Sequence, residues 1–108
     1  MEWDVVYFNE AVRNTIAAWP VGLRAVYQRL LERIAEHGPN LGMPFTRSMG
    51  GGMFEIRVKG PEGIGRAFYC TVTGHRVVVL HAIIKKSQKT PAQALDTARA
   101  RMRMINHD

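Results

Sequence analysis

Residues 54–86 constrain the fold most, because they have the pattern of three consecutive strands joined by two short turns. The first strand alternates between apolar and charged residues: Phe54, Glu55, Ile56, Arg57, Val58 and Lys59. Such alternation is typical of a strand with one buried and one polar face. Residues 60–63 and 73–74 have turn composition, and the almost continuous apolar run after residue 75 indicates a central strand. This stretch therefore predicts an antiparallel three-stranded meander.

The flanking segments add helices on both sides of the meander. Residues 3–8 predict a short strand, Asn9 is expected to cap a helix ending near Trp19, and a second helix is expected from Pro20 to His37. The sequence from Thr90 to Gln93 resembles a capping box that starts a last helix. We therefore expect one α+β domain over residues 1–108. In it a helical hairpin packs on a mainly antiparallel sheet of about four strands, and a C-terminal helix follows.

Residues 38–52 contain five glycines and two prolines, and we expect them to form a loop that acts as a hinge before the sheet. The glycine run at 50–52 does not match a phosphate-binding P-loop, since no Gly-Lys-Ser/Thr follows it. The sequence also has no cysteine cluster, HExxH motif or nucleotide-binding fingerprint, so no metal site or cofactor is expected.

The charge distribution indicates an anionic partner. Residues 57–103 carry ten basic and two acidic side chains, whereas residues 1–46 carry four basic and five acidic ones. Nucleic acid is the commonest partner of such a surface, although basic residues also serve solubility. The single cysteine, Cys70, is expected to pack in the core of a protein from a reducing compartment. We expect a cytoplasmic protein without a membrane span or secretion signal.

A basic group around the meander is the candidate site: Arg57, Lys59, Arg66, Lys85, Lys86 and Lys89. RNA carries its own nucleophile, the 2′-hydroxyl, so a protein that aligns it and neutralises phosphate charge can promote strand cleavage. The same residues also suit a solvated face that only binds RNA, or ion pairs with Glu55.

Three residues of this region remain open at this stage. Arg66 shares its strand alternation with apolar residues, so either a bulge redirects it or that face of the sheet is not wholly buried. His81 lies in an apolar strand and is interpreted either as a core histidine or as part of the site. Tyr69 is suited to stacking on a base but equally to the core.

The chain from Ser48 to Pro91 resembles the phage-derived, HigB-like branch of the RelE/ParE toxin superfamily. The resemblance lies in the glycine-rich start, in Phe54-Glu55-Ile56-Arg57, in Arg66-Ala67-Phe68-Tyr69 and in the segment from His81 to Pro91. It implies a ribosome-associated, metal-independent mRNA endoribonuclease that works by 2′-hydroxyl attack. Residues matching Arg57, Arg66, Lys85 and Lys86 serve the cleavage site of that family. We further assign RNA contacts to four residues: Lys59, Tyr69, His81 and Lys89.

The resemblance also implies partners. A toxin of this type is inhibited by a cognate helix-turn-helix antitoxin, acts on mRNA at the ribosome, and is expected to assemble into oligomers through the antitoxin. Some members of the superfamily act on gyrase instead, because a shared fold does not fix the target. The alternatives are therefore a toxin with a protein target such as gyrase, or a non-catalytic RNA-binding domain.

Overall fold

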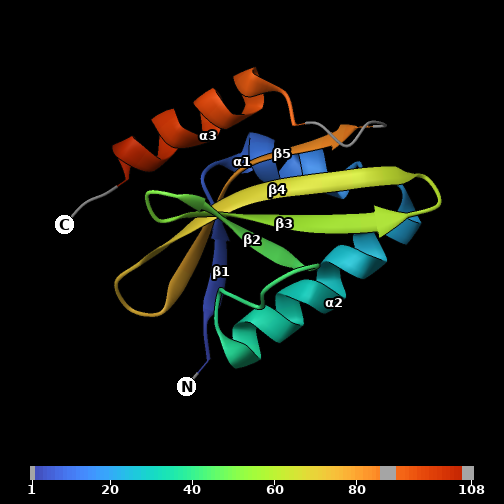
Figure 1. Ribbon diagram of the computed structural model, residues 1–108. Helices are drawn as coiled ribbons and strands as arrows, with labels where there is room; N and C mark the ends of the chain where they lie inside the picture. The colour runs from blue at the N-terminus through green and yellow to red at the C-terminus, as the bar shows by residue number, and fades with distance from the viewer. Residues whose placement is uncertain (1, 86–89, 106–108) are drawn as a thin grey trace.

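The computed structural model describes residues 2–85 and 90–105, which form a twisted sheet with helices on both faces (Figure 1). The elements in chain order are β1 (Asp4–Tyr7), α1 (Glu10–Ala17), α2 (Val21–His37), β2 (Thr46–Gly50), β3 (Met53–Gly60), β4 (Gly63–Val72), β5 (Arg76–Lys85) and α3 (Ala92–Met104). The sheet order is β1-β5-β4-β3-β2, in which β1 runs parallel to β5 and the other neighbours are antiparallel. The predicted α+β fold with its helical hairpin and C-terminal helix is confirmed, with five strands in the described part of the chain instead of four.

The additional strand is β2, in a segment for which the sequence predicts only a loop. β2 pairs antiparallel with β3, so that Thr46 lies opposite Ile56 and Arg47 opposite Glu55. Gly50, Gly51 and Gly52 all have positive φ values (88°, 65° and 89°), a conformation that side chains other than glycine rarely adopt. They form the tight turn of a hairpin, which folds residues 46–50 back along β3, and the hinge interpretation was therefore wrong for those residues.

One face of the sheet packs on α1 and α2. Asn9 caps α1 as predicted, since its Oδ1 accepts a hydrogen bond of 3.0 Å from the Val12 N–H. The predicted apolar stripes of both helices are buried against the sheet, in a cluster made of Val12, Ile16, Trp19, Leu23, Tyr27, Leu30, Ile34, Ile56, Val58, Ala67, Tyr69, Val77, Val79 and Ala82. This cluster, which we call the hairpin-side core, is the larger of the two cores.

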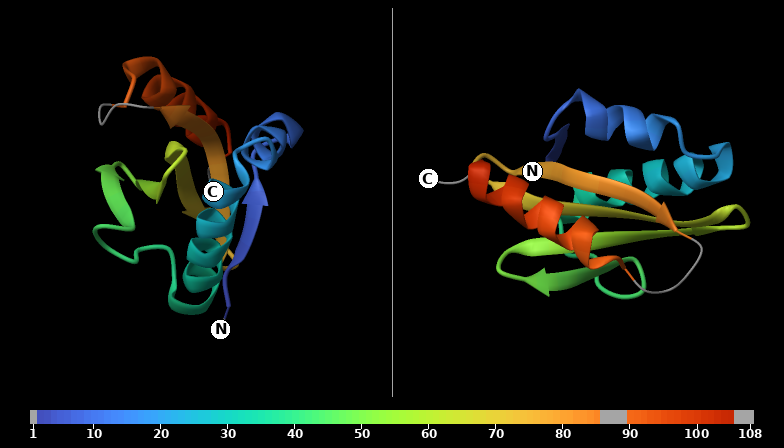
Figure 2. Two further views of the ribbon diagram at one scale, coloured as in Figure 1. Left: turned by 90° about the vertical axis from the view of Figure 1, so that its right-hand side faces the viewer. Right: turned by 90° about the horizontal axis from the view of Figure 1, so that it is seen from above.

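The other face packs on α3, which lies across the sheet from the helical hairpin (Figure 2). Here a smaller cluster, the α3-side core, contains Met53, Phe68, Cys70, Val78, Leu80, Ala94 and Ala98. Arg99 and Arg101 hold α3 in place by donating hydrogen bonds of 2.7 Å to Met49 O and 2.8 Å to Leu80 O. Cys70 is a buried packing residue, as expected, and burial raises the pKa of its thiol.

The predicted capping box at the start of α3 is not formed. The residue before the helix is Pro91, and no side chain caps the first turn. The Thr90 hydroxyl instead donates to Glu55 Oε2 at 3.2 Å, 35 residues away in the chain. The local pattern was wrong here because a buried carboxylate across the sheet competes for the same hydroxyl.

Gly65 on β4 allows the closest approach between the helical hairpin and the sheet. A Cβ atom at this position would lie 2.8 Å from the ring carbons of Trp19, which is buried at the end of α1. Because the indole rests directly on the backbone of β4, only glycine fits without displacing the ring. None of the described helices is both long enough and apolar enough to span a membrane.

Candidate nucleic-acid interface

Strand register brings the two predicted arginines together. In the β3–β4 pair, Arg57 lies directly opposite Arg66, and Glu55 lies opposite Phe68. Because side chains alternate along a strand, all four project from the α3 side of the sheet. The predicted juxtaposition of Arg57 and Arg66 is therefore present in the structure. Two like charges directly across a ladder repel each other, so this arrangement needs a compensating partner.

Glu55 is that partner for Arg66. Arg66 Nη1 donates to Glu55 Oε2 at 2.9 Å, with only 2% and 0% of the two side chains exposed. Arg47 Nη2 on β2 lies 3.5 Å from Glu55 Oε1, and the Thr90 hydroxyl completes the group. We call Glu55, Arg66, Arg47 and Thr90 the Glu55 cluster. Buried charges require such partners, since an isolated ion loses its hydration without replacement.

The Glu55 cluster explains how Arg66 can lie on the same face of β4 as apolar residues. No register shift occurs at Arg66, and the bulge in the β4–β5 pair lies further along, between Phe68 and Tyr69. Arg66 therefore does share a face with the apolar residues of β4, and that face is covered. What makes its position tolerable is the carboxylate of Glu55, which is itself fully buried.

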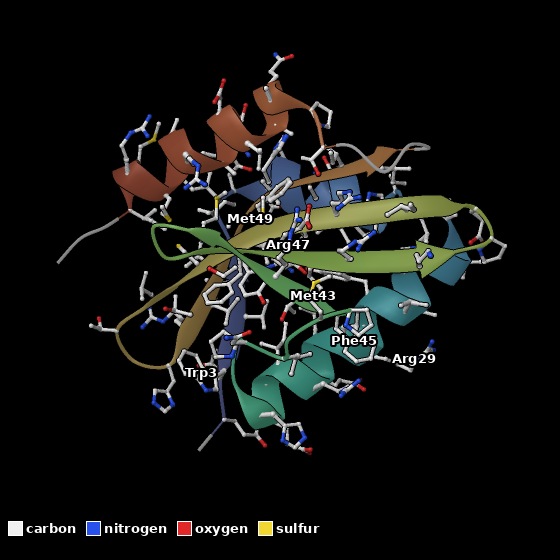
Figure 3. All side chains as sticks on the ribbon, in the orientation of Figure 1. Trp3, Arg29, Met43, Phe45, Arg47 and Met49 are labelled. Carbon is white, nitrogen blue, oxygen red and sulfur yellow. The ribbon has the colours of Figure 1, made fainter. Side chains whose placement is uncertain are left out.

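Arg57 and Lys59 lie further toward the end of β3, where the sheet is more open. Lys59 is exposed and Arg57 is partly exposed. Both line a hollow that also contains Phe45 and two arginines of α2, Arg29 and Arg33. Arg29 and Phe45 are labelled in Figure 3, where they lie close to each other beside α2. This end of the sheet therefore offers cationic groups that a polyanion can reach.

His81 lies on β5 in the same row across the sheet as Glu55 and Phe68. Its register partner is Phe68, and the bulge at Leu80 precedes it. His81 lines a small hollow under α3 together with Pro91 and Thr97. Burial, and then the positive charge of Arg101, lower the pKa of His81 below its usual 6.5. The imidazole is therefore neutral at pH 7 and able to accept a proton or a hydrogen bond.

Other predicted residues have different positions. Tyr69 is only 1% exposed and belongs to the hairpin-side core, where its hydroxyl donates to Pro39 O. Its ring is therefore not available for stacking on a base, and it has no place in the candidate site. The backbone of Lys85 ends β5 opposite Ile64, near the end of the sheet that carries Arg57. Lys86 and Lys89 lie outside the described residues.

Some residues of this region were not assigned from the sequence. The sequence of residues 46–50 predicts a loop and so gives no sign of Arg47, and the local capping pattern at Thr90 gives no sign of its partner across the sheet. The position of Glu55 had a signal, since it alternates with Arg57 and must share its face. Within residues 2–85 and 90–105, no three His, Cys, Asp or Glu side chains are grouped so that they could hold a metal ion.

The fold and this arrangement define a class of protein: a small α+β chain whose mixed sheet has a charged end under a C-terminal helix. A search of solved structures finds this fold in the E. coli toxin RelE, in a mutant form in the free state. The TM-score is 0.61 at 15% identity, over 94% of this chain and 99% of that one. The likeness is therefore one of fold.

The family follows from the sequence itself. A family model for phage-derived Gp49-like proteins matches residues 14–103, so the chain belongs to that family. Together with the RelE-like fold, this confirms the resemblance that the strand motifs indicate. A comparison with curated protein sequences finds no match.

Proposed function

We propose that this chain is the toxin of a toxin–antitoxin pair and that it cleaves mRNA at the ribosome. The observation that carries the proposal is the register of Arg57 opposite Arg66 on a cationic sheet end. Membership of the Gp49-like family and the RelE-like fold support it. The partners in this proposal are mRNA, the ribosome and a cognate helix-turn-helix antitoxin that forms a mixed oligomer with the toxin. The site of action is the cytoplasm.

The proposed reaction uses the RNA's own 2′-hydroxyl. Its oxygen attacks the adjacent phosphorus while its proton passes to a base, and the bond from phosphorus to the 5′-oxygen breaks. The leaving oxygen takes up a proton, which yields a 2′,3′-cyclic phosphate and a 5′-hydroxyl. The protein's contribution is alignment of the nucleophile and stabilisation of the extra negative charge on the phosphorane. Arg57 is the described residue best placed for phosphate contact, and Lys85 and Lys86 join it in the proposal by resemblance.

Arg66 has a different role in this scheme. Its side chain is 2% exposed and its guanidinium is bound to Glu55, so it does not reach a phosphate in this conformation. We assign it as a positioning residue that keeps Glu55 neutralised and β3 in register, with Arg57 directly across the ladder. His81 and Lys59 are assigned to RNA contact at the two sides of this region.

The test is primer extension on mRNA after induction of the wild type, Arg57→Ala and Arg76→Ala. Arg76→Ala is the control, because it removes the same single positive charge as Arg57→Ala. Arg76 is exposed and lies at the end of β5 that is far from Arg57. New mRNA 5′ ends are expected with the wild type and Arg76→Ala, and about 100-fold weaker with Arg57→Ala, the effect of losing one charge-stabilising donor. Equal cleavage by the two variants would contradict the proposal.

A second candidate is RNA binding without cleavage. The observation that favours it is the burial of Arg66, because a cleavage residue of the family is held in an ion pair. In that case the mRNA 5′ ends stay unchanged on induction, while the purified protein still retains labelled mRNA on a filter. Growth arrest without new mRNA 5′ ends, together with retention of mRNA on the filter, would support RNA binding without cleavage.

A further inference from the structure

A hollow of about 520 Å³ lies between α2, the end of β3 and the loop that precedes β2. Its floor is apolar, with Val26 and Leu30 from α2 and with Pro44 and Phe45 from the loop. Its rim is cationic, with Arg29, Arg33, Arg57 and Lys59, and none of its lining residues is acidic. The volume is within the range of roughly 300–1,000 Å³ that is usual for small-molecule sites.

The hollow exists because β2 is shorter than β3. The last register pair of β2 and β3 in this direction is Thr46 with Ile56, so Val58 to Gly60 extend beyond their neighbour. The loop then takes over, since Arg57 N–H donates to Phe45 O at 3.0 Å. The N–H groups of Phe45 and Thr46 both donate to Gly42 O at 3.0 Å. These bonds hold the backbone of Phe45 at the edge of β3 before any ligand binds.

The four cations come from two elements with matching periodicity. Arg29 and Arg33 are one helical turn apart on α2, and Arg57 and Lys59 are two residues apart on β3. Arg29 and Arg33 therefore share one face of α2, and Arg57 and Lys59 share the α3-side face of β3; all four line the hollow, which lies at the edge of β3. Like charges one helical turn apart, as in Arg29 and Arg33, repel each other and bring no stability to the fold, so an anion bound between them would offset that cost. The Arg33 guanidinium also lies 4.6 Å from the centroid of the Phe45 ring.

An aromatic ring and apolar floor surrounded by cations suit one chemistry in particular. In single-stranded nucleic acid, an unstacked base needs a flat apolar surface and the flanking phosphates need positive groups. Arg57 lines the hollow and also lies opposite Arg66, so the hollow is continuous with the proposed cleavage site. An acidic peptide would use the cations, but it would have less use for the Phe45 ring and the apolar floor.

We propose that this hollow is a nucleotide subsite for single-stranded RNA, next to the cleavage site. One base packs on Phe45, Pro44 and Leu30, while Arg29, Arg33 and Lys59 bind the phosphates on either side of it. The inference rests on the proposed function for its choice of RNA, and it adds the surface that holds the strand beyond the cleaved bond. It therefore predicts a binding contribution from α2, an element that the cleavage site itself does not use.

The test is equilibrium binding of single-stranded RNA in which every 2′-hydroxyl is methylated, so that 2′-hydroxyl attack is impossible. The variants are the double substitution Arg29→Ala with Arg33→Ala, and a control that combines Arg13→Ala with Arg76→Ala. All four arginines are exposed, and both doubles remove two charges. Fluorescence anisotropy across a salt series is the readout, with circular dichroism to verify folding.

The double variant Arg29→Ala with Arg33→Ala is expected to bind the methylated RNA about tenfold or more weakly than the control double variant. Its slope of log affinity against log salt is expected to fall by about 0.7 for each phosphate contact removed, the value for single strands. Phe45→Ala is expected to lose about tenfold through lost stacking, with little change in salt slope, and Phe45→Tyr is expected to retain the affinity. Equal losses in the two double variants would overturn the subsite.

Competition by an oligoglutamate peptide separates the two kinds of anion. If the peptide displaces RNA at matched ionic strength, and Phe45→Ala leaves RNA affinity unchanged, the hollow is a peptide site and the inference is wrong. The experiment is also independent of cleavage. A protein that binds the methylated RNA through Arg29 and Arg33 but never cuts unmodified mRNA would contradict the proposed function and leave the subsite standing.

Discussion

The two faces of the sheet solve the problem of burial in different ways. The hairpin-side core is large and apolar, and its hydroxyls are paired with one another or with the backbone, as in the 2.9 Å contact between Tyr7 and Tyr27. The α3-side core is smaller, and within the β3–β4 pair the Glu55 cluster lies on this face next to the apolar residues. The first face accounts for why the chain folds. The second holds a buried ion pair, and replacing such a pair by apolar residues of similar size is often neutral for stability.

The largest expected effect is on the charged end. Arg66→Ala leaves Glu55 buried without its closest partner, and we expect the free energy of unfolding to fall by about 3–5 kcal/mol. The double substitution Glu55→Met with Arg66→Met removes both charges and is expected to be close to wild type in stability. Urea denaturation of both variants measures this. A single variant as stable as the double would show that the two charges do not depend on each other.

This expectation also changes how activity should be tested. Loss of cleavage in Arg66→Ala would be explained by unfolding as readily as by chemistry. Arg57→Ala is the better variant, because Arg57 is partly exposed and does not belong to the Glu55 cluster. Arg66→Lys, which keeps the positive charge beside Glu55, is the matched control for the positioning role. It is expected to stay folded and to lose part of the cleavage, through its poorer fork geometry.

A medium effect is expected at the closest contact of the apolar face. Gly65→Ala places a methyl group 2.8 Å from the Trp19 ring, and we expect a loss of about 1–3 kcal/mol from overpacking. Trp19→Phe should relieve part of this loss, because the smaller ring withdraws from β4. Thermal or urea unfolding of the two single variants and the double tests the coupling. Additive losses would mean that the two groups do not meet.

The smallest expected effect is the pH dependence of stability that comes from His81, on the α3 side of the sheet. The pKa of His81 is lowered in the folded chain by burial and by Arg101, whereas the unfolded chain has the usual value of about 6.5. The unfolded state therefore binds the proton first, and stability is lost as pH falls from about 6.5 toward the lower folded value. His81→Asn should flatten this part of the stability curve and leave it unchanged above pH 7. An unaltered slope in the variant would exclude His81 as its cause.

Much of the fold could be predicted, because its signals are local. The alternation in β3, the cap at Asn9 and the stripes of α1 and α2 depend on residues close in sequence. β2 was missed, since Thr46, Arg47, Ser48 and Met49 before three glycines give no strand pattern of their own. It forms only because the glycine turn delivers it to the edge of β3. The hydroxyl of Thr90 was misassigned for a similar reason, since its partner lies across the sheet.

The candidate site was predictable in its charges but not in their pairing. The sequence indicates that Arg57 and Arg66 are neighbours, and the register bears this out. Which of them stays accessible depends on Glu55 and on how α3 covers the sheet, both of which are long-range features. Arg29 and Arg33 look like ordinary solvent-exposed helix residues in the sequence. Their relation to Phe45 arises only where the loop closes over the end of β3.

The most direct measurement compares two mRNAs of the same base sequence. One of them carries a single deoxynucleotide on the 5′ side of the cleaved bond. Each is incubated with ribosomes and purified protein, and the 3′ ends of the fragments are analysed by mass spectrometry. We predict that the unmodified mRNA yields a 2′,3′-cyclic phosphate and that the deoxy-substituted mRNA stays whole at that bond. Cleavage of the substituted mRNA at the same bond, or intact unmodified mRNA, would contradict the account.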